Sequence, residues 1–595
     1  MDWLSRVLRM TRSMRGSDLD AFAMQIAADI ALQNRLPGIA TLLLDQAVAS
    51  VEESVWDTNG PTILLLYGKA IEEAGNSAAA DRLYAIAAER GSRERGAAMI
   101  TADSARSDLA DRRGDAALAL KLSEEAFRAV LEGRSRVGQE NYKLSFITNS
   151  ASVGEQYLRL HAAAGTSPSA LLDAVEAWRL QVFKDMYLGG LAGEARPQGI
   201  ATTLQAALQP GEAYVSYAVG ERWSAAILVT PSAVSVIGLG IDRESLSRDL
   251  SPLHHWLDPS RHDALAFIKG DRVPTELEAT LRRLYDELIA PLKLKGQIRT
   301  LAISSDEPLA GVPWGALLQP GTLIDLGEET LGFQALHYLY QQLAIAVVPS
   351  AQILLGSSPI GLAADVRNWR VGLVGAFEGI PGPQLQIVMP QLDPSSVNQG
   401  LPELSNGSDE LSQVAKAFRG QVPIVLLDST TLGKHNGLPA PQLASRSAVL
   451  DLLPKVAVAH IIGHAVFNAA APMESEILLD KKSHSVVTAE DLLGLDLSNI
   501  RLVVLSACET GQGRMAVGGE SFGFLRGLMG AKARGAILSL WPVDDAATAE
   551  FFGRFYKEWA NHSAGEALRL AAMHEFDLHH HPFFWAAPTL YGWWR

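Results

Sequence analysis

The sequence predicts an α plus α/β protein, in which an N-terminal array of helical repeats precedes a mostly parallel sheet flanked by helices. A chain of 595 residues is too long for a single core, so we expect several domains. Residues 17–196 are rich in Ala, Leu, Arg and Glu, with apolar positions at helical spacing. From about Arg370 onward, short apolar runs alternate with helical patterns, which is typical of a parallel sheet covered on both faces.

Residues 1–196 carry a weak internal repeat that indicates stacked helical hairpins. Pairs of alanines seven residues apart recur at intervals of 40, 39 and 51 residues, and a turn signal such as Gly75-Asn76-Ser77 precedes each pair. Small residues at this spacing let two helices approach closely, and stacked hairpins share a core. The pattern resembles tetratricopeptide repeats with longer, irregular spacing; a generic helical bundle is the alternative. The pairs are Ala40 and Ala47, Ala80 and Ala87, Ala119 and Ala126, and Ala170 and Ala177.

A glycine-rich break at residues 189–199 indicates a linker between the helical domain and the next domain of the chain. We expect residues 200–365 to form an accessory α/β half, because the hydrophobic period changes there from that of helices to that of strands. This half contains no obvious reactive group. Its expected strands are 213–218, 225–229 and 233–237 in a meander, then 299–304 and 344–348, with a helix at about 275–292.

Residues 366–595 show the strand and helix alternation most clearly and are expected to form a second α/β half. In sheets of parallel strands, ligands bind just beyond the C-terminal ends of the strands. The expected strands are 371–376, 423–427, 456–462, 502–506 and 536–540, and the expected helices are about 409–418, 445–453, 522–529, 548–559 and 566–575.

Two residues able to do chemistry follow apolar strands in this half. His464 ends the segment VAVAHIIGH, and Cys508, the single cysteine of the chain, follows RLVVLSA. Their separation of 44 residues fits one strand, loop, helix and strand, so the two are expected on neighbouring parallel strands about 4.8 Å apart. An imidazole beside a thiol raises its thiolate fraction and makes it a nucleophile. His460, at an even offset on the same strand, is expected to be a packed core residue.

The motifs around this pair resemble those of a CHAT domain, a caspase-like family similar to separase. The resemblance covers about Thr202 to Arg595 and rests on an ordered series of motifs. They are His464 after its strand, SACETG around Cys508, Gly518-Gly519-Glu520, the strand at 535–540 followed by Trp541-Pro542-Val543-Asp544-Asp545, and the closing HPFFWAA segment. Members of this family commonly carry tetratricopeptide repeats in front of it. The resemblance implies a caspase-like sheet with a pseudo-protease-like accessory half at 200–365 and a catalytic half at 366–595.

The resemblance also implies cysteine endopeptidase chemistry by a dyad, with Cys508 as nucleophile and His464 as base and acid. It assigns the oxyanion hole to the backbone N–H groups of Ala465 and Cys508. The family usually has Gly after the histidine, so the Ala465 methyl group is a departure that could narrow the site or disfavour a special backbone conformation.

Asp544 and Asp545 are the expected lining of a pocket for the side chain that precedes the cleaved bond. By similarity to separase, this predicts cleavage after Arg or Lys, because carboxylates pair well with guanidinium groups. Asp544 is the preferred candidate for the pocket. Asp545 could instead cap the helix that begins near Ala546.

The amino-acid composition argues against several classes of partner and location. The net charge of −15 argues against direct nucleic-acid binding, which depends on Lys and Arg. No apolar run is long enough for a membrane span, the N-terminus lacks a secretory cleavage pattern, and one cysteine fits the reducing cytoplasm. We expect no cofactor and no metal; the run His579-His580-His581 is read as a loop before an aromatic strand. Expected partners are a protein or peptide substrate and a regulatory protein at the repeats. The alternatives are an inactive caspase-fold scaffold, or the protease subunit of a bacterial defence or RNA-guided complex.

Overall fold

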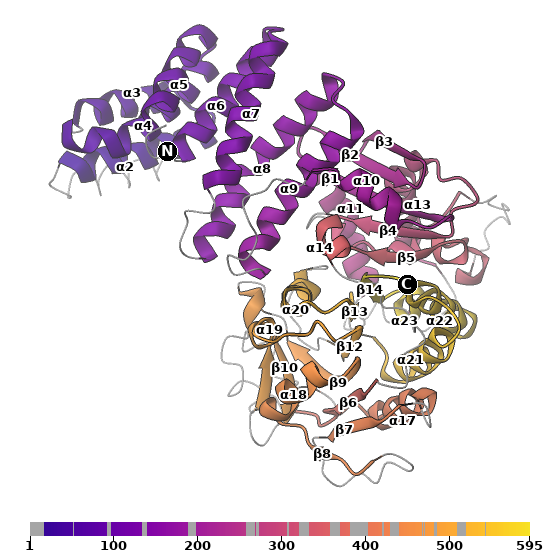
Figure 1. Ribbon diagram of the computed structural model, residues 1–595. Coiled ribbons are helices and arrows are strands. Elements are labelled where there is room, and N and C mark those ends of the chain that lie inside the picture. The colour runs from indigo at the N-terminus through magenta and orange to yellow at the C-terminus, as the bar shows by residue number, and fades with distance from the viewer. Residues whose placement is uncertain are drawn as a thin grey trace. The chain divides into compact units, whose positions relative to one another are not determined.

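The computed structural model divides the chain into two compact units, one ending at Ser167 and the other beginning at Pro168. The elements of each unit can be followed in Figure 1. The structure describes residues 17–50, 53–91, 97–133, 140–187, 198–257, 268, 273–305, 309–320, 332–356, 369–380, 401, 403–418, 422–428, 439–466, 468, 471–480, 485–508, 519–541 and 543–595.

The first unit consists of helices that pack as sequential neighbours. Its hairpins are α2 with α3, α4 with α5, and α6 with α7, and α8 packs on α7. The first three expected alanine pairs are fully buried, which confirms their role as close-packing positions. The helices are α2 Ser17–Gln33, α3 Pro37–Ser50, α4 Glu53–Glu73, α5 Ser77–Gly91, α6 Ala97–Arg112, α7 Ala116–Gly133 and α8 Glu140–Ala163.

The turns after α2, α4, α6 and α8 explain the spacing of the repeat. Each contains one residue with positive φ, namely Arg35, Gly75, Gly114 and Gly165. The following residue donates its N–H back into the helix, as Asn76 does to Ile71 O at 3.0 Å. This is the left-handed helix ending in which glycine carries no steric penalty. The intervals between these four residues match those of the alanine pairs.

The fourth alanine pair does not belong to this array. Ala170 is exposed, and its helix, α9 (Pro168–Tyr187), is part of the second unit. The first compact unit thus ends at Ser167, before the domain boundary that the sequence predicts at residue 196. The physical reason is a buried polar anchor, in which Arg179 Nη1 donates to Ser216 Oγ at 2.6 Å and to Ser304 Oγ at 2.9 Å, while Glu176 accepts from Tyr214 Oη at 2.9 Å.

The second unit is built on one continuous sheet of fourteen described strands rather than on two separate sheets. The order is β3-β2-β1-β4-β5-β14-β13-β12-β9-β6-β7-β8, and β10 and β11 form a hairpin beside the end of β9. The strands are β1 Glu212–Val219, β2 Ser224–Thr230, β3 Ala233–Leu239, β4 Thr300–Ser304, β5 Ala344–Val347, β6 Val371–Gly375, β7 Ile424–Asp428, β8 Gln442–Leu443, β9 Val458–Val466, β10 Glu476–Asp480, β11 Ser485–Thr488, β12 Leu502–Cys508, β13 Gly535–Ser539 and β14 Pro588–Gly592.

Strand β14 joins the strands of residues 200–365 to the other strands of residues 366–595. It pairs antiparallel with β13 from Gly535↔Gly592 to Ser539↔Pro588, and parallel with β5 at Tyr591↔Val347. Gly592 has φ 94°, and a Cβ there would lie 2.4 Å from Arg534 O, so only glycine fits this close approach. The sequence pattern predicted an aromatic strand after the histidine run 579–581, but neither the bounds of β14 nor its partners.

Helices cover both faces of the sheet formed by residues 366–595. Along β9, Ala459 and Ile461 belong to the core that includes Val449 of α18 and Leu528 of α20. His460 points to the opposite face, where α17 and α21 lie. These helices are α17 Gly407–Phe418, α18 Arg446–Leu452, α19 Ala489–Leu493, α20 Gly519–Gly530, α21 Asp545–Trp559, α22 Ala564–His579 and α23 Pro582–Trp585; the accessory half has α10 Ile200–Ala207, α11 Arg243–Trp256, α13 Thr275–Leu288 and α14 Ala351–Gly356.

Candidate active site

Strands β9 and β12 bring His464 and Cys508 side by side. The two strands pair in parallel from Leu502↔Val458 to Cys508↔His464, so the last pair of the ladder consists of the two predicted residues. Neighbouring strands lie about 4.8 Å apart. Both residues therefore occupy the C-terminal edge of the sheet, where parallel α/β sheets bind their ligands.

The strand that carries His464 is buried along almost its whole length. From Val458 to Val466 only Ala465 is partly exposed, and the side chain of His464 is 1% exposed. A run of apolar residues without polar alternation forms such a strand because both of its faces are covered. The backbone of His464 is thus held by the rigid centre of the sheet.

His460 confirms the expectation of a packed core histidine. Its Nε2 lies 2.8 Å from Glu410 Oε1 on α17, and its Nδ1 lies 3.1 Å from Tyr556 Oη on α21. Phe552 packs edge-on against its ring. Burial and the nearby Glu410 carboxylate raise the pKa of Tyr556 well above its ordinary value, so its hydroxyl stays protonated. This network holds both helices on the face of the sheet that His460 shares with His464.

Ala465 lies within β9, in register with Ile477 of β10. The four described non-glycine residues with positive φ are Arg35, Lys293, Lys532 and His580, so Ala465 has an ordinary strand conformation. The alanine therefore introduces no backbone strain at this position, and of the two effects considered for its methyl group only the narrowing of the site stays open.

Asp544 and Asp545 follow β13, the other neighbour of β12, and each has a structural role. Asp544 is the N-cap of α21, where its Oδ1 accepts from Ala546 N at 3.0 Å and from Ala547 N at 3.1 Å. The alternative that Asp545 caps this helix is wrong, because the helix begins at Asp545 itself. Asp545 Oδ2 instead accepts from the backbone N of Asn406 at 2.6 Å, which ties α21 to the segment before α17.

Residues 278–593, more than half of the chain, match the sequence profile of the CHAT domain. The chain belongs to the CHAT-domain family. CHAT domains are a caspase-like, protease-related family. The match begins inside α13. The β1–β3 meander therefore lies outside the matched residues, although the resemblance described from the sequence began at about Thr202 and included this meander.

Two further comparisons concern parts of larger proteins. The chain is 36% identical over 112 residues to Tetratricopeptide repeat protein 28 of Mus musculus, which covers 18% of this chain and 4% of the mouse protein. Two crystal structures of the Saccharomyces cerevisiae separase–securin complex align with TM-scores of 0.46 and 0.43 at 9% and 10% identity. Each alignment covers 99% of this chain and 48% of the solved chain, so this chain spans about half the length of the solved chain.

The histidine run 579–581 of the CHAT domain connects α22 to α23, so a short helix rather than a strand directly follows it. His579 ends α22, and His581 is the N-cap of α23, where its Nδ1 accepts from Phe583 N at 3.0 Å. Burial lowers the pKa of His581 to about 3, so this ring is neutral. Within the described part of the chain, no group of three or more His, Cys, Asp or Glu side chains is arranged to hold a metal ion. The described helices also include none long and apolar enough to cross a membrane.

Glu575 of the CHAT domain is a fully buried carboxylate on α22, and neither of its oxygens has a hydrogen-bond partner among the described residues. Burial raises its pKa from 4.5 to about 8, and the nearby carboxylates of Glu550 and Asp544 add to the shift. The folded state therefore keeps this carboxyl protonated at neutral pH, while the unfolded chain ionises it near pH 4.5.

Glu575→Gln is expected to stabilise the protein increasingly as pH rises. In the wild type, the contribution of this carboxyl to the free energy of unfolding is constant below pH 4.5. Between pH 4.5 and pH 8 it falls by about 1.4 kcal/mol per pH unit, because the carboxyl ionises in the unfolded state but stays protonated in the folded state. Glutamine does not titrate, so the free energy of unfolding of the variant should exceed that of the wild type by up to about 5 kcal/mol near pH 9. Denaturant unfolding at about pH 5 and about pH 9 measures this difference. The exposed Glu490→Gln serves as the control; a pH-independent difference between Glu575→Gln and the wild type would contradict the assignment.

Two buried ionisable side chains, Glu575 and Arg179, were not predicted from the sequence, although the sequence contains a signal for each. Glu575 continues the apolar stripe of α22 formed by Ala567, Ala571 and their neighbours, and Arg179 continues the stripe of α9 after Val175. A charged residue at a core position of an amphipathic helix indicates a buried polar contact or a functional group. Glu410 gave no such signal, since acids are common in the first turn of a helix.

Proposed function

We propose that the chain is a cysteine endopeptidase that uses His464 and Cys508 as a catalytic dyad. The observation that carries the proposal is the register Cys508↔His464 at the C-terminal edge of two adjacent parallel strands. Membership of the CHAT family supports the class of chemistry. A nucleophile beside a base, with its backbone fixed by a buried strand, is the arrangement that acyl transfer requires.

In the proposed reaction, the Cys508 thiol loses its proton to His464 and the sulfur forms a bond to the scissile carbonyl carbon. The C=O electron pair moves onto oxygen, and as it returns, the C–N bond breaks and His464 gives its proton to the leaving amine. Water then attacks the thioester, His464 takes a proton from that water, and the acid product leaves as the thiol is restored. General acid and base catalysis of this kind contributes about 10²- to 10⁴-fold in rate.

The backbone of β9 supports Ala465 as an oxyanion-hole donor, together with the N–H of Cys508. Ala376 N donates to Ile462 O at 2.9 Å, so even-numbered residues of this strand direct their polar groups toward β6. Odd-numbered residues, including Ala465, direct theirs toward β12 because backbone groups alternate along a strand. The Ala465 N–H is therefore on the side of Cys508, where an oxyanion would develop.

Asp544 is the better candidate for binding a basic side chain of the substrate. It is exposed and uses Oδ1 for both helix-capping bonds, whereas Asp545 is partly buried and bonded to Asn406. Asp544 lies after β13, next to the strand that ends in Cys508. The proposed preference is cleavage after Arg or Lys, since either cation can pair with its carboxylate.

Helix α9 offers a route by which the helical repeats regulate the protease. It follows the repeat array in the chain and is anchored in the accessory half by Arg179. It also packs beside α20, the first described helix after Cys508. We propose that a protein partner bound to the repeats acts through α9 on α20 and so on the segment that connects it to the nucleophile. The alternative of an inactive scaffold is favoured only by the Ala465 methyl group.

Cleavage profiling with a peptide library tests the proposal in the wild type, Cys508→Ala and Asp544→Asn. We expect cleavage after Arg and Lys in the wild type, none in Cys508→Ala, and a loss of about tenfold or more in kcat/KM for basic substrates in Asp544→Asn, with less change for neutral ones. Asn keeps the helix cap, so the fold is preserved. Unchanged cleavage after Arg in Asp544→Asn overturns the pocket. A wild type that cleaves no peptide, and leaves Cys508 unlabelled by a thiol-reactive arginine ketone, favours the scaffold.

A further inference from the structure

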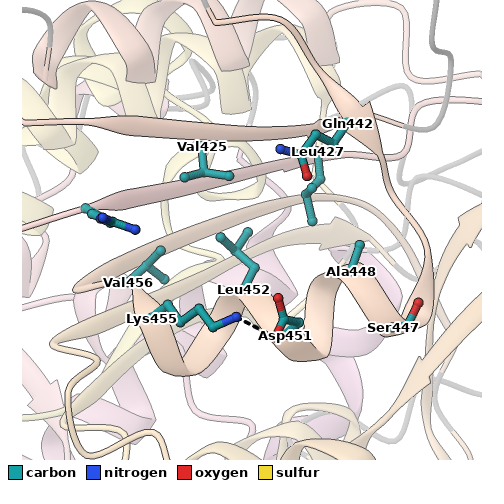
Figure 2. Close-up of a pocket in the computed structure, with 10 residues that line it drawn as sticks. Val425, Leu427, Gln442, Ser447, Ala448, Asp451, Leu452, Lys455 and Val456 are labelled. Atoms are coloured by element: carbon teal, nitrogen blue, oxygen red, sulfur yellow. Dashed lines mark hydrogen bonds and ion pairs between the residues drawn. The ribbon is translucent and has the colours of Figure 1, made fainter.

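A cavity lies near the outer edge of the sheet, beside β7 rather than beside the strands that carry His464 and Cys508. A cavity of about 490 Å³ opens between β7 and α18, within the range of about 300 to 1,000 Å³ that is usual for ligand pockets. Figure 2 shows Val425 and Leu427 of β7 above this space, and Leu452 and Val456 below it. The inner wall is thus apolar.

Among the described residues, only part of the outer edge of β7, the strand beside this cavity, is paired with another strand. The two-residue strand β8 pairs with Leu427 and Asp428 alone, so the preceding residues Ile424, Val425 and Leu426 have no strand partner on their outer side among the described residues. An uncovered strand edge presents backbone N–H and C=O groups at the spacing that another extended chain requires. Leu443 of β8 adds an apolar side chain that is half exposed.

The charges at the cavity favour an acidic group in its occupant. Lys455 is already paired with Asp451, and the dashed line in Figure 2 marks this ion pair. Arg370 lines the same cavity, is exposed, and has no ion pair with any described acidic side chain. Among the described residues, the cavity therefore offers one unpaired cation next to an apolar wall.

We propose that an extended peptide segment of a partner protein adds to the free edge of β7, inserts an apolar side chain into the cavity and places a carboxylate against Arg370. The backbone edge selects an extended chain, the cavity selects its apolar residue, and Arg370 selects an acid. The cavity runs along β7 from the N-terminal end of the sheet, where Arg370 precedes β6 and Val456 precedes β9, to Leu427, which pairs with Gln442 of β8. Its Val456 end is roughly 26 Å from His464 along the strand, and β6 separates β7 from β9, so the cavity serves as a docking site rather than a part of the candidate active site.

Selection from a displayed library of random peptides tests the proposal, with the full chain as target and Ala448→Trp as counter-target. Ala448 lines the cavity and is only partly buried, so Trp fills the space without disturbing the core. We expect enriched peptides with alternating apolar residues and an Asp or Glu. Their affinity should fall about tenfold or more in Ala448→Trp and in Arg370→Glu, and after N-methylation of alternate peptide bonds. The exposed Lys557→Glu, which carries the same charge change on α21, should bind as the wild type does.

Several results would overturn this inference. One is that the same peptides are enriched equally on the wild type and on Ala448→Trp. Another is that N-methylation leaves the peptide affinities unchanged. A third is a concentration-dependent dimer of the wild type that Ala448→Trp abolishes, because the occupant would then be a second copy of this chain. Arg370 is exposed, so Arg370→Glu remains informative if Ala448→Trp fails to fold. The same affinities are expected in Cys508→Ala, so a failure of the proposed protease chemistry leaves this test intact.

Discussion

His464→Ala is expected to lower kcat/KM for a basic peptide substrate by about a thousandfold or more, which corresponds to about 4 kcal/mol of transition-state stabilisation. The variant loses the group that is proposed to take the Cys508 proton and return it to the leaving amine. The same substitution should shift the pH dependence of Cys508 alkylation upward, toward the ordinary thiol pKa of about 8.5, because the stabilising imidazole is gone.

His562→Ala is the matched control, since His562 is exposed and contacts only Glu558 on the far end of α21. It should retain wild-type rates. Thermal unfolding of each variant shows whether lost activity reflects lost structure. A His464→Ala protein that is folded and cleaves within about tenfold of the wild type would remove His464 from the mechanism.

Arg179→Met is expected to destabilise the second unit by about 3 to 5 kcal/mol, because it leaves Glu176 buried without its counter-charge. Arg179 is 3% exposed and Glu176 is fully buried, with 3.6 Å between their charged atoms. Methionine keeps much of the volume of the Arg179 side chain, so the loss of stability reports the removal of its positive charge. Burial raises the pKa of Glu176 even beside Arg179, and removing the cation should raise it further. Denaturant unfolding measures the change.

The double variant Glu176→Gln with Arg179→Met should recover a part of this loss, since no uncompensated charge is then buried. Arg446→Met breaks an exposed pair with Asp491 and should cost about 1 kcal/mol or less. If Arg179→Met costs no more than Arg446→Met, α9 is not anchored as described. A double variant that is stable but no longer responds to a partner at the repeats would place the coupling in α9.

The sequence was sufficient to predict most of the helices and central strands and the adjacency of His464 and Cys508. Helical period, turn glycines and alanine pairs are local signals, and the close packing at Ala80 and Ala87 follows from them. The separation of His464 and Cys508 also carried real information, because one helical crossover connects adjacent parallel strands with few alternatives.

The features that the sequence could not predict depend on contacts between distant segments. The fourth alanine pair repeats the local pattern, yet Ala170 is exposed because Arg179 draws α9 into the sheet unit. Whether Asp544 or Asp545 caps α21 depends on the residue at which the helix begins. Hydrophobic periodicity does not locate the start of a helix to a single residue. Strand β14 is short and rich in aromatic neighbours, and its two partners, β13 and β5, come from different halves of the sheet.

The position of β14 has a consequence for synthesis on the ribosome. Every other described strand precedes it in the chain, yet it is the central piece between β5 and β13. Until it emerges, β13 lacks its outer partner and β5 lacks its link to the half that carries His464 and Cys508. Trp594, two residues after β14, then bonds Glu212 of β1 through its indole N–H at 2.7 Å. The nascent protein therefore cannot complete its sheet before these residues are made, whereas β9 and β12, which carry His464 and Cys508, can pair with each other earlier.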